Sequence, residues 1–366
     1  MRIVLAHGGD LSVPSGGHER IVAFASGLAD HGHEVAVVAP TPGASLPERL
    51  DGVDVRPVDV PTNGVRTQPR RGIAVTRAAR RLANQWEARL QVEHSPLGGV
   101  TSVLGGEGYV LDMHDVAFAS PFYRDRPLGT VLSRGIRWVE GRGLRSAGDV
   151  VVVSERMASF VAETWDVSPE AITVVPNGYF ETDVAGVEPE THDGTRVVFV
   201  GTLHPKLDFE AVVDCAGLSE VDDLLVVGDG PMRAELARAK RERGVDSLSL
   251  PGRLSTRRTW SLVAGADVAI NPQRQSPTQA VSSPVKLCYY RALGVPMVLS
   301  DGPDLARTFA DEGVAFLVGP DEDFAARLAA LLSDETALQA ARSRIRSTPS
   351  GPTWADRAET LCRVYE

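Results

Sequence analysis

The N-terminal part of the chain alternates short apolar runs with a longer segment of helical periodicity. Residues 2–6 and 35–39 are short apolar runs, and each predicts a buried strand. The segment between them, residues 18–31, places its apolar residues on one helical face: Ile21, Val22, Phe24, Ala25 and Leu28. A strand, a helix and a strand in this order predict a parallel α/β unit.

The same alternation continues to residue 178. We predict a helix at residues 156–164 and further strands at residues 53–58, 109–112, 149–153 and 172–175. The run at 149–153 is almost wholly valine, which is typical of a central parallel strand buried on both faces. Residues 176–178, Pro-Asn-Gly, then form a strong turn signal.

A second α/β series follows a polar, turn-rich segment at residues 183–194. We predict strands at residues 196–201, 223–227, 247–250, 267–270 and 296–299. The helices predicted between them span residues 208–217, 231–242, 256–264 and 284–293. Two such series predict two Rossmann-like α/β domains facing a cleft, with ligands at the carboxyl ends of the strands.

These patterns divide the chain into four parts. The predicted parts are an N-terminal Rossmann-like domain at residues 1–182, a linker at 183–194, a C-terminal Rossmann-like domain at 195–350, and a last helix at 351–366. The last segment is amphipathic, with one apolar face formed by Trp354, Ala358, Leu361 and Tyr365. We expect this helix to pack across the two domains.

Composition narrows the function classes. The chain has 366 residues, and at about 150 residues per domain this length predicts two domains. Acidic residues exceed basic ones by 48 − 38 = 10, which argues against a nucleic-acid partner because phosphate binding needs a basic footprint. The three cysteines stand far apart and no apolar run is long enough to span a membrane. We therefore expect a cytoplasmic protein.

Glycine-rich turns before helices mark candidate anion sites. Gly16 and Gly17 precede the first helix, where free backbone N–H groups and the helix dipole suit a phosphate. The segment 282–286, Ser-Ser-Pro-Val-Lys, opens a later helix in the same way. Lys206 follows the first strand of the second series, and residues 227–231 form a glycine-rich strand-to-helix turn. Each feature also fits a plain structural turn or a solvated lysine.

Five motifs follow one another along the chain: Gly16-Gly17, Val175-Pro176-Asn177-Gly178, Phe199-Val200-Gly201-Thr202-Leu203, Val227-Gly228-Asp229-Gly230-Pro231, and the segment from Pro284 to Pro296. In this order they resemble the motifs of the GT-B glycosyltransferases, in particular the retaining family 4 enzymes, or glycosyl transferases group 1. The resemblance covers nearly the whole chain. It implies transfer of a sugar from a nucleoside-diphosphate sugar, of the UDP or GDP type, to a hydroxyl or lipid-linked acceptor in glycan or glycolipid assembly, with retention and without a metal or other cofactor.

The resemblance also implies roles for particular residues. It implies that Lys206 and His114 are catalytic, Lys206 by neutralising the leaving diphosphate and His114 by facing the donor sugar or acceptor with Asp115 as its orienting partner. It implies a donor site formed by Gly16, Gly17, Gly228, Arg253, Ser283, Val285, Lys286 and Tyr289. His114 also fits a loop histidine with local hydrogen bonds only, and His7 is a weaker candidate.

The chain departs from the family at an acidic pair. Members carry a glutamate, seven residues, and a second glutamate that binds the ribose hydroxyls, and these places fall on Val281 and Tyr289 here. Tyr289 either offers its hydroxyl to the ribose or packs in the core. This departure leaves open an inactive nucleotide-sugar-binding subunit. A nucleotide-sugar 2-epimerase, which has the same two-domain architecture, is a second alternative.

A basic amphipathic stretch lies in the first domain, between residues 66 and 90. Its apolar face comprises Val75, Ala78, Leu82, Trp86 and Leu90, and its arginines include Arg70, Arg77 and Arg81. A second basic cluster follows at Arg124, Arg126, Arg134, Arg137, Arg142 and Arg145. The stretch fits an anchor on an anionic membrane surface or a site for a lipid-phosphate acceptor, and it fits equally an ordinary core helix with a solvated arginine face. A membrane-surface scaffold is the corresponding non-enzymatic alternative. We thus expect the protein free in the cytoplasm or peripheral on the cytoplasmic face of the membrane.

Overall fold

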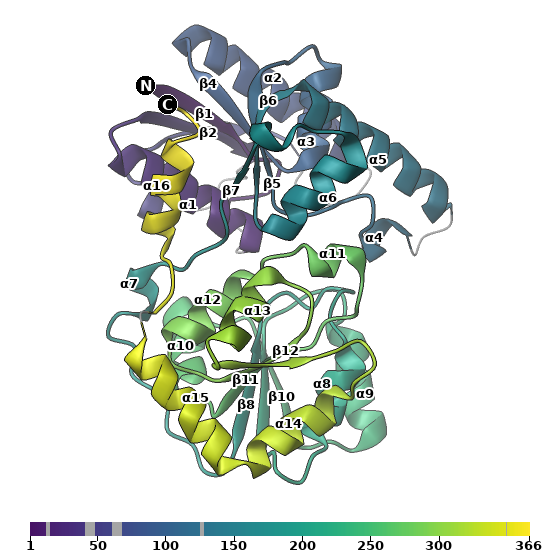
Figure 1. Ribbon diagram of the computed structural model, residues 1–366. Helices are drawn as coiled ribbons and strands as arrows, with labels where there is room; N and C mark the ends of the chain where they lie inside the picture. Colours follow the sequence, from purple (N-terminus) through teal and green to yellow (C-terminus); the bar gives the residue numbers. More distant parts are fainter. Residues whose placement is uncertain (12–14, 41–47, 61–67, 125–127, 349) are drawn as a thin grey trace. The chain divides into compact units, whose positions relative to one another are not determined.

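The chain forms two compact units in a computed structural model (Figure 1). The structure describes residues 1–11, 15–40, 48–60, 68–124, 128–348 and 350–366. The first unit comprises residues 1–177, 281–283 and 354–366, and the second comprises residues 178–280 and 284–353. The two parallel sheets confirm the predicted pair of Rossmann-like domains.

A parallel sheet of seven strands is the framework of the first unit, in the order β3-β2-β1-β4-β5-β6-β7. The strands are β1 (Arg2–Ala6), β2 (Glu34–Pro40), β3 (Asp54–Val58), β4 (Arg89–Glu93), β5 (Tyr109–Met113), β6 (Ala147–Val152) and β7 (Ile172–Val174). The strand order reverses between β1 and β4, and ligands of open α/β sheets bind at the carboxyl ends of the strands at such a point.

Helices flank this sheet in the described part of the first unit. They are α1 (Gly16–Asp30), α2 (Gln68–Trp86), α3 (Ser95–Val103), α4 (Pro121–Arg124), α5 (Gly129–Ser146), α6 (Glu155–Trp165) and α16 (Trp354–Cys362), with 3-10 turns η1 (Glu48–Leu50) and η3 (Pro169–Ala171). The helix α1 begins where the Ser15 hydroxyl accepts a hydrogen bond from the His18 N–H, the usual way in which a serine caps a helix.

The basic amphipathic stretch is a helix only as far as Trp86. Glu87 takes a left-handed conformation with φ of 50°, and the N–H of Ala88 bonds to the Ala83 carbonyl, which together end the helix. Leu90 therefore lies on β4 and not on the helical face where we predicted it. The strand β4 was absent from our prediction because the helical spacing was extended across it.

A parallel sheet of six strands forms the framework of the second unit, in the order β10-β9-β8-β11-β12-β13. The strands are β8 (Arg196–Val200), β9 (Asp223–Val227), β10 (Leu248–Gly252), β11 (Val268–Asn271), β12 (Met297–Ser300) and β13 (Ala315–Val318). Neighbouring residues of β8 enter different cores, since Val197 and Phe199 pack on one face of the sheet and Val198 on the other. Both faces are therefore covered, as parallel sheets require.

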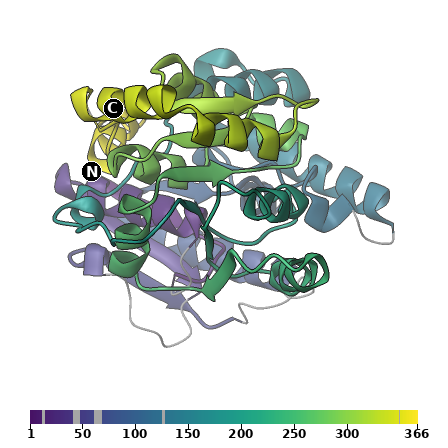
Figure 2. The same cartoon turned by 90° about the horizontal axis from the view of Figure 1, so that it is seen from below.

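Helices lie on both faces of the second sheet (Figures 1 and 2). They are α7 (Glu181–Val184), α8 (Phe209–Ala216), α9 (Arg233–Arg243), α10 (Thr256–Ala264), α11 (Pro277–Ala280), α12 (Val285–Ala292), α13 (Asp304–Asp311), α14 (Phe324–Ser333) and α15 (Glu335–Ser347). The cores on the two faces draw on different helices: α8, α9 and α14 on one, and α10, α12 and α13 on the other.

The predicted linker, residues 183–194, lies within the second unit. Two hydrogen bonds attach it to Ser261 of α10: the Glu190 N–H donates to the Ser261 carbonyl, and the Ser261 hydroxyl donates to the Glu188 carbonyl. The division between the units falls between Asn177 and Gly178, inside the Pro-Asn-Gly turn.

The C-terminal helix α16 belongs to the first unit and packs on α1. Its predicted apolar face is confirmed, because Trp354, Ala358, Leu361 and Tyr365 are all buried. The Trp354 ring meets Phe24 edge to face, and its indole N–H donates to Glu19 at 3.0 Å. The second unit begins at residue 178 and ends at residue 353, so α16 returns the chain to the domain in which it began.

Candidate functional site

Polar side chains gather at the carboxyl edge of the first sheet. His7 follows β1, Glu93 ends β4, and His114 follows β5, so all three come from neighbouring strands at the point where the strand order reverses. The register pairs Glu93 directly with Asp112 on β5. The polar edge of this sheet is therefore assembled from residues that lie far apart in the sequence.

The carboxylate of Glu93 lies between two histidines. It accepts a hydrogen bond from His7 Nδ1, and its Oε1 atom lies 3.7 Å from His114 Nδ1. Glu93 is 1% exposed, and its Oε1 accepts no hydrogen bond within the described residues. Burial is the main cause that lowers the pKa of His7 to about 3, so His7 is neutral and donates through Nδ1.

A buried ion pair, Arg20 with Asp112, lies beside Glu93 and its two histidines. The Arg20 guanidinium contacts both oxygens of Asp112, at 2.7 and 2.8 Å, and both side chains are at most 1% exposed. Arg20 also donates to the Val175 carbonyl and to the Asn177 side chain. The asparagine of the predicted turn thus helps to hold α1 against the end of β7.

Glu93, Asp112 and His114 also meet the distance requirement of a metal site. One donor atom of each lies within 4.8 Å of the others. Arg20, however, already neutralises Asp112 through both oxygens, so a dication here would lie against a buried guanidinium. The donor set therefore fits a cation poorly, and we assign no metal to it.

Gly17 borders the same space as His114. A Cβ atom on Gly17 would lie 3.0 Å from His114 Nε2 and 3.4 Å from Glu93 Oε1. The structure thus brings the predicted residues Gly17 and His114 together, and Gly16 precedes Gly17 as the first residue of α1. The carboxylates of Glu93 and Asp112 lie 3.7 and 4.0 Å from His114 Nδ1.

Sequence reasoning missed Glu93 because it missed β4. The signal was present in the segment 92–96, Val-Glu-His-Ser-Pro, where an apolar run is followed by a serine and a proline that open a helix. Pro96 does stand in the first turn of α3, directly after the strand. Glu93 thus stands at the carboxyl end of its strand, just as His114 stands at the carboxyl end of the next strand.

Glycine loops pack backbone against backbone at the carboxyl edge of the second sheet. Gly201, after β8, and Gly228, after β9, both take positive φ, 146° and 145°, and a Cβ on Gly228 would overlap the Gly201 carbonyl. A Cβ on Gly230 would lie 2.6 Å from the Leu203 carbonyl. The predicted turn at 227–231 is confirmed, and only glycine fits where the loops touch.

Lys286 points into the same edge. Its Nζ lies 4.1 Å from the centre of the Phe199 ring and 2.6 Å from the position of a Cβ on Gly201. Burial lowers the pKa of Lys286 to about 7. The second unit therefore holds a partly buried cation at the end of β8, where the strand order reverses towards β11.

The remaining predicted residues of the donor site lie on several different elements. Lys206 lies in the turn between β8 and α8, its carbonyl accepting the Arg274 N–H, and Arg253 is exposed just after β10. Val285 is the first residue of α12. Ser283 belongs to the first unit, is buried, and its hydroxyl has no hydrogen-bond partner within the described residues.

Tyr289 packs in the core and is not positioned to hold a ribose. Its ring stacks on Trp260 with the centroids 4.1 Å apart, and the side chain is 1% exposed. Its hydroxyl donates to Asp183 at 3.0 Å and accepts the Phe180 N–H at 3.3 Å. Of the two roles that the sequence left open, the structure favours packing because both hydrogen-bonding directions are already used.

The helix α2 is a core helix with a solvated arginine face. Its buried residues include Val75, Ala79 and Ala83, while Leu82 and Trp86 are partly buried against the same core. The apolar face is therefore covered by the sheet and is not available to anchor a membrane, which corrects the anchor interpretation. Arg70, Arg77 and Arg81 are exposed, and Arg66 lies outside the described residues.

Two family models match the chain, one on each unit. Residues 15–178 match the glycosyl transferase 4-like domain, and residues 194–334 match the glycosyl transferases group 1 domain. The chain belongs to the GT-B glycosyltransferases. This glycosyltransferase carries both domains in the order that the motifs predicted, and it is an enzyme of glycosyl transfer.

Solved structures share the fold of this glycosyltransferase at low identity. They include WaaG, a glycosyltransferase of lipopolysaccharide biosynthesis, with 14% identity and a TM-score of 0.77 over 100% of this chain and 99% of that one. Sucrose-phosphate synthase of Thermosynechococcus elongatus has 16% identity and a TM-score of 0.78 over 100% and 98%. Anabaena HepE, solved with UDP and glucose, has 16% identity and a TM-score of 0.71 over 100% and 98%. No curated protein matches the chain.

Among the residues that the structure describes, no helix has the length and apolarity needed to cross a membrane.

Proposed function

We propose that this glycosyltransferase moves a sugar from a nucleoside-diphosphate sugar, of the UDP or GDP type, to a hydroxyl acceptor with retention. The observation that carries the proposal is the edge of the second sheet, where Lys286 stands against the glycine loop at Gly201. A cation beside tightly packed glycine backbone suits a diphosphate, because the ligand can approach the main chain closely. The fold similarity to a structure solved with UDP is consistent with this.

In this proposal the second unit holds the nucleoside diphosphate. Lys286 and Lys206 supply positive charge, Gly228 permits close approach of the backbone, and Val285 offers its N–H at the start of α12. Arg253 contributes a further cation after β10. No metal or other cofactor enters the proposal.

The first unit supplies the groups that meet the sugar. Gly16 and Gly17 open α1, and His114 adjoins Gly17. In the reaction the bond between the anomeric carbon and the diphosphate oxygen breaks, and the acceptor oxygen forms the new bond to that carbon while losing its proton. Negative charge develops on the leaving diphosphate, so the cations and N–H groups at the helix starts lower the barrier.

The acceptor is proposed to be a glycan or a lipid-linked hydroxyl, met at the cytoplasmic face of the membrane. Arg70, Arg77 and Arg81 share the exposed face of α2 and are suited to the anionic groups of such an acceptor.

A thermal-shift screen against UDP, GDP, dTDP and ADP, without metal, tests the donor proposal. A ligand at 100 times its Kd stabilises the folded state by about 2.7 kcal/mol, which is a measurable shift. One diphosphate should shift the midpoint, and its sugar conjugates should then be consumed only when an acceptor is present. Turnover of a free nucleotide sugar to its epimer would indicate the 2-epimerase, and binding without any turnover the inactive subunit. The absence of a shift with every diphosphate would reject the proposal.

A further inference from the structure

Large apolar side chains are exposed on α5 between its first residue and Trp138, and at Leu128 just before the helix. Leu128, Val131, Leu132 and Trp138 are 81%, 65%, 40% and 58% exposed. They provide four of the six large hydrophobic residues that stand exposed in the described part of the chain. Exposed apolar residues concentrated on one helix mark an interaction surface, whereas single ones are normal.

The C-terminal half of α5 is packed firmly in the first unit and holds the exposed part of the helix in place. Gly143 packs against the backbone of Gly98 and Gly99 on α3, so the two helices cross in close contact. Glu140 is fully buried, and its carboxylate accepts hydrogen bonds from the Ser95 hydroxyl and from the N–H groups of Ala117 and Phe118. The rest of the helix extends away from the strands of the first sheet (Figure 1). A rigid base thus presents an apolar end.

Arginines accompany the apolar residues along the same helix. Arg134, Arg137, Arg142 and Arg145 are exposed, and none of them forms an ion pair with any residue that the structure describes. The acidic residue of α5, Glu140, is buried and occupied by three donors. In a chain of net charge −10, this face is therefore locally cationic.

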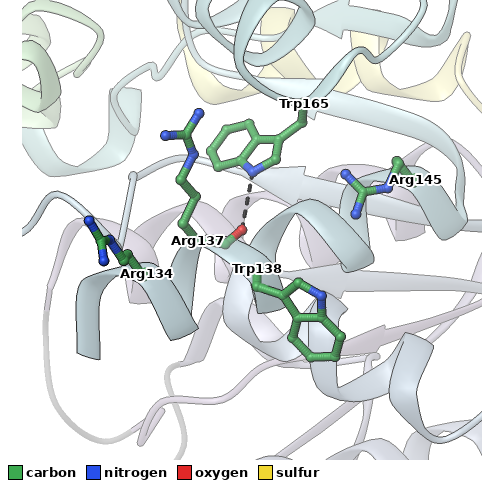
Figure 3. A pocket seen from close by; sticks show the side chains of 5 residues that line it. All are labelled: Arg134, Arg137, Trp138, Arg145 and Trp165. Atoms are coloured by element: carbon green, nitrogen blue, oxygen red, sulfur yellow. Dashed lines mark hydrogen bonds between the residues drawn. The ribbon is translucent and has the colours of Figure 1, made fainter. Parts of the chain in front are cut away.

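A hollow of about 280 Å³ lies between these arginines (Figure 3). Arg134, Arg137, Trp138, Arg145 and Trp165 line it. The Trp165 indole N–H donates to the Arg137 carbonyl at 3.2 Å, and the guanidinium groups of Arg137 and Arg145 lie on either side of the indole. Gly141 leaves the room that Trp165 occupies, since a Cβ there would overlap the ring.

We propose that this α5 surface (Leu128, Val131, Leu132, Trp138 and the four arginines) docks on a membrane that contains anionic phospholipids. Phosphate headgroups bind the unpaired arginines and the hollow, Trp138 lies at the interface, and Leu128, Val131 and Leu132 enter the acyl boundary. Arginine with tryptophan and aliphatic residues on one helix is the pattern of an interfacial helix. Unpaired cations select an anionic partner.

The shape of the surface favours a membrane over an acidic protein. The apolar residues stand on a projecting helix end, which a fluid lipid layer can surround, whereas a protein partner would need a matching pocket. The helix α2 makes the contrast, because it has exposed arginines but its apolar residues are covered by the sheet. One consequence of the inference rests on the proposed function: the acceptor is presented at the membrane surface.

Vesicle flotation with the purified full chain tests the proposal. Vesicles of phosphatidylcholine alone are compared with vesicles containing phosphatidylglycerol, at low and high salt. We expect binding only to the anionic vesicles, and weaker binding at high salt. The pair Arg134→Gln and Arg142→Gln should lower the partition coefficient by about fivefold for each arginine. The pair Leu128→Ser and Val131→Ser should abolish the part of the binding that resists salt.

The matched control replaces Arg238 and Arg241, two exposed arginines of α9, with glutamine. The loss of two arginines from α9 should leave vesicle binding close to that of the unaltered chain. The proposal is overturned if the α9 variant loses binding while both α5 variants retain it, if the unaltered chain binds neither vesicle, or if it binds an acidic polypeptide matrix but no vesicle. The diphosphate thermal shift is measured on the same samples. If the donor proposal is wrong, this shift is absent whether or not the chain binds vesicles.

Discussion

The Nε2 atom of His114 lies 3.0 Å from the place where a Cβ atom would stand on Gly17. The first turn of α1 and the loop after β5 therefore border one space at the carboxyl edge of the first sheet. A ligand that contacts the Gly17 backbone also meets the His114 imidazole. A methyl group at Gly17 therefore tests this shared space without straining the backbone.

The variant Gly17→Ala should fold normally and lose activity. The residue stands in the first turn of a helix without positive φ, so alanine suits the backbone, but its methyl group displaces His114 and Glu93. Misplacement by about 1 Å of a catalytic group costs on the order of 10²-fold in rate. Steady-state kinetics measure the loss. Gly135→Ala, on α5 with nothing within 4 Å of its Cβ position, is the matched control and should keep full activity.

Glu93 should stabilise the fold through His7. In Glu93→Leu the buried His7 N–H has no acceptor, which costs about 1–3 kcal/mol of unfolding free energy. In Glu93→Gln the amide oxygen still accepts that hydrogen bond, so the loss should be smaller. Urea denaturation of the two variants checks the order. Equal stability of the leucine variant and the unaltered chain would contradict the pairing.

The Arg20–Asp112 pair should be among the costliest to break. Removing one partner of a buried pair leaves an uncompensated charge, and Arg20→Met or Asp112→Leu should each destabilise by about 3–5 kcal/mol. The double variant should recover much of this loss, because no charge is left unpaired. Glu34→Gln, which breaks the exposed pair with Arg2, is the control and should change stability by about 0–1 kcal/mol.

Lys286 should make diphosphate affinity depend on pH. Burial lowers its pKa to about 7 from 10.5, and a bound diphosphate favours the charged form. Diphosphate affinity should therefore fall as pH rises above 7. Loss of the single proton of Lys286 limits the fall to about tenfold for each pH unit. The ligand adds no further change there, because a phosphate with pKa of about 6 is already ionised. Titration calorimetry at pH 6.5 and about 8.5 measures this. Lys286→Arg stays charged, so its affinity should not change with pH.

The same lysine predicts how stability varies without ligand. Its folded-state pKa is lower than its unfolded value, so between pH 7 and 10.5 the unfolded chain binds more protons. The contribution of Lys286 to stability therefore rises with pH through that window. Subtracting the melting profile of Lys286→Met from that of the unaltered chain isolates it, and a flat difference would contradict a lowered pKa.

Lys206 should act on the leaving group. Removing one group that stabilises developing charge typically costs about 10²–10³ in turnover. Lys206→Ala should lose activity on that scale and keep its melting temperature, because the side chain stands in a turn outside the cores. Lys206→Arg should retain part of the activity. Turnover of the alanine variant near that of the unaltered chain would remove Lys206 from the mechanism.

Much of the fold could be read from the sequence, but less of the site. The valine-rich strand at 149–153, the glycine turn at 227–231 and the apolar face of the last helix are local patterns, and all three are confirmed. Glu93 was missed, because a helical spacing that runs into β4 hides the strand. Its place beside His114 depends on the pairing of β4 with β5, and strand register is not written in either strand alone.

The sequence by itself determined the class of the protein. Apolar runs that can be buried on both faces require parallel sheets covered by helices, and the glycine and proline motifs place the loops that bind ligands. Tertiary structure decided which of two similar basic helices offers an apolar surface. The face of α2 packs on the sheet, whereas the end of α5 extends past it, and burial depends on what a helix meets in space.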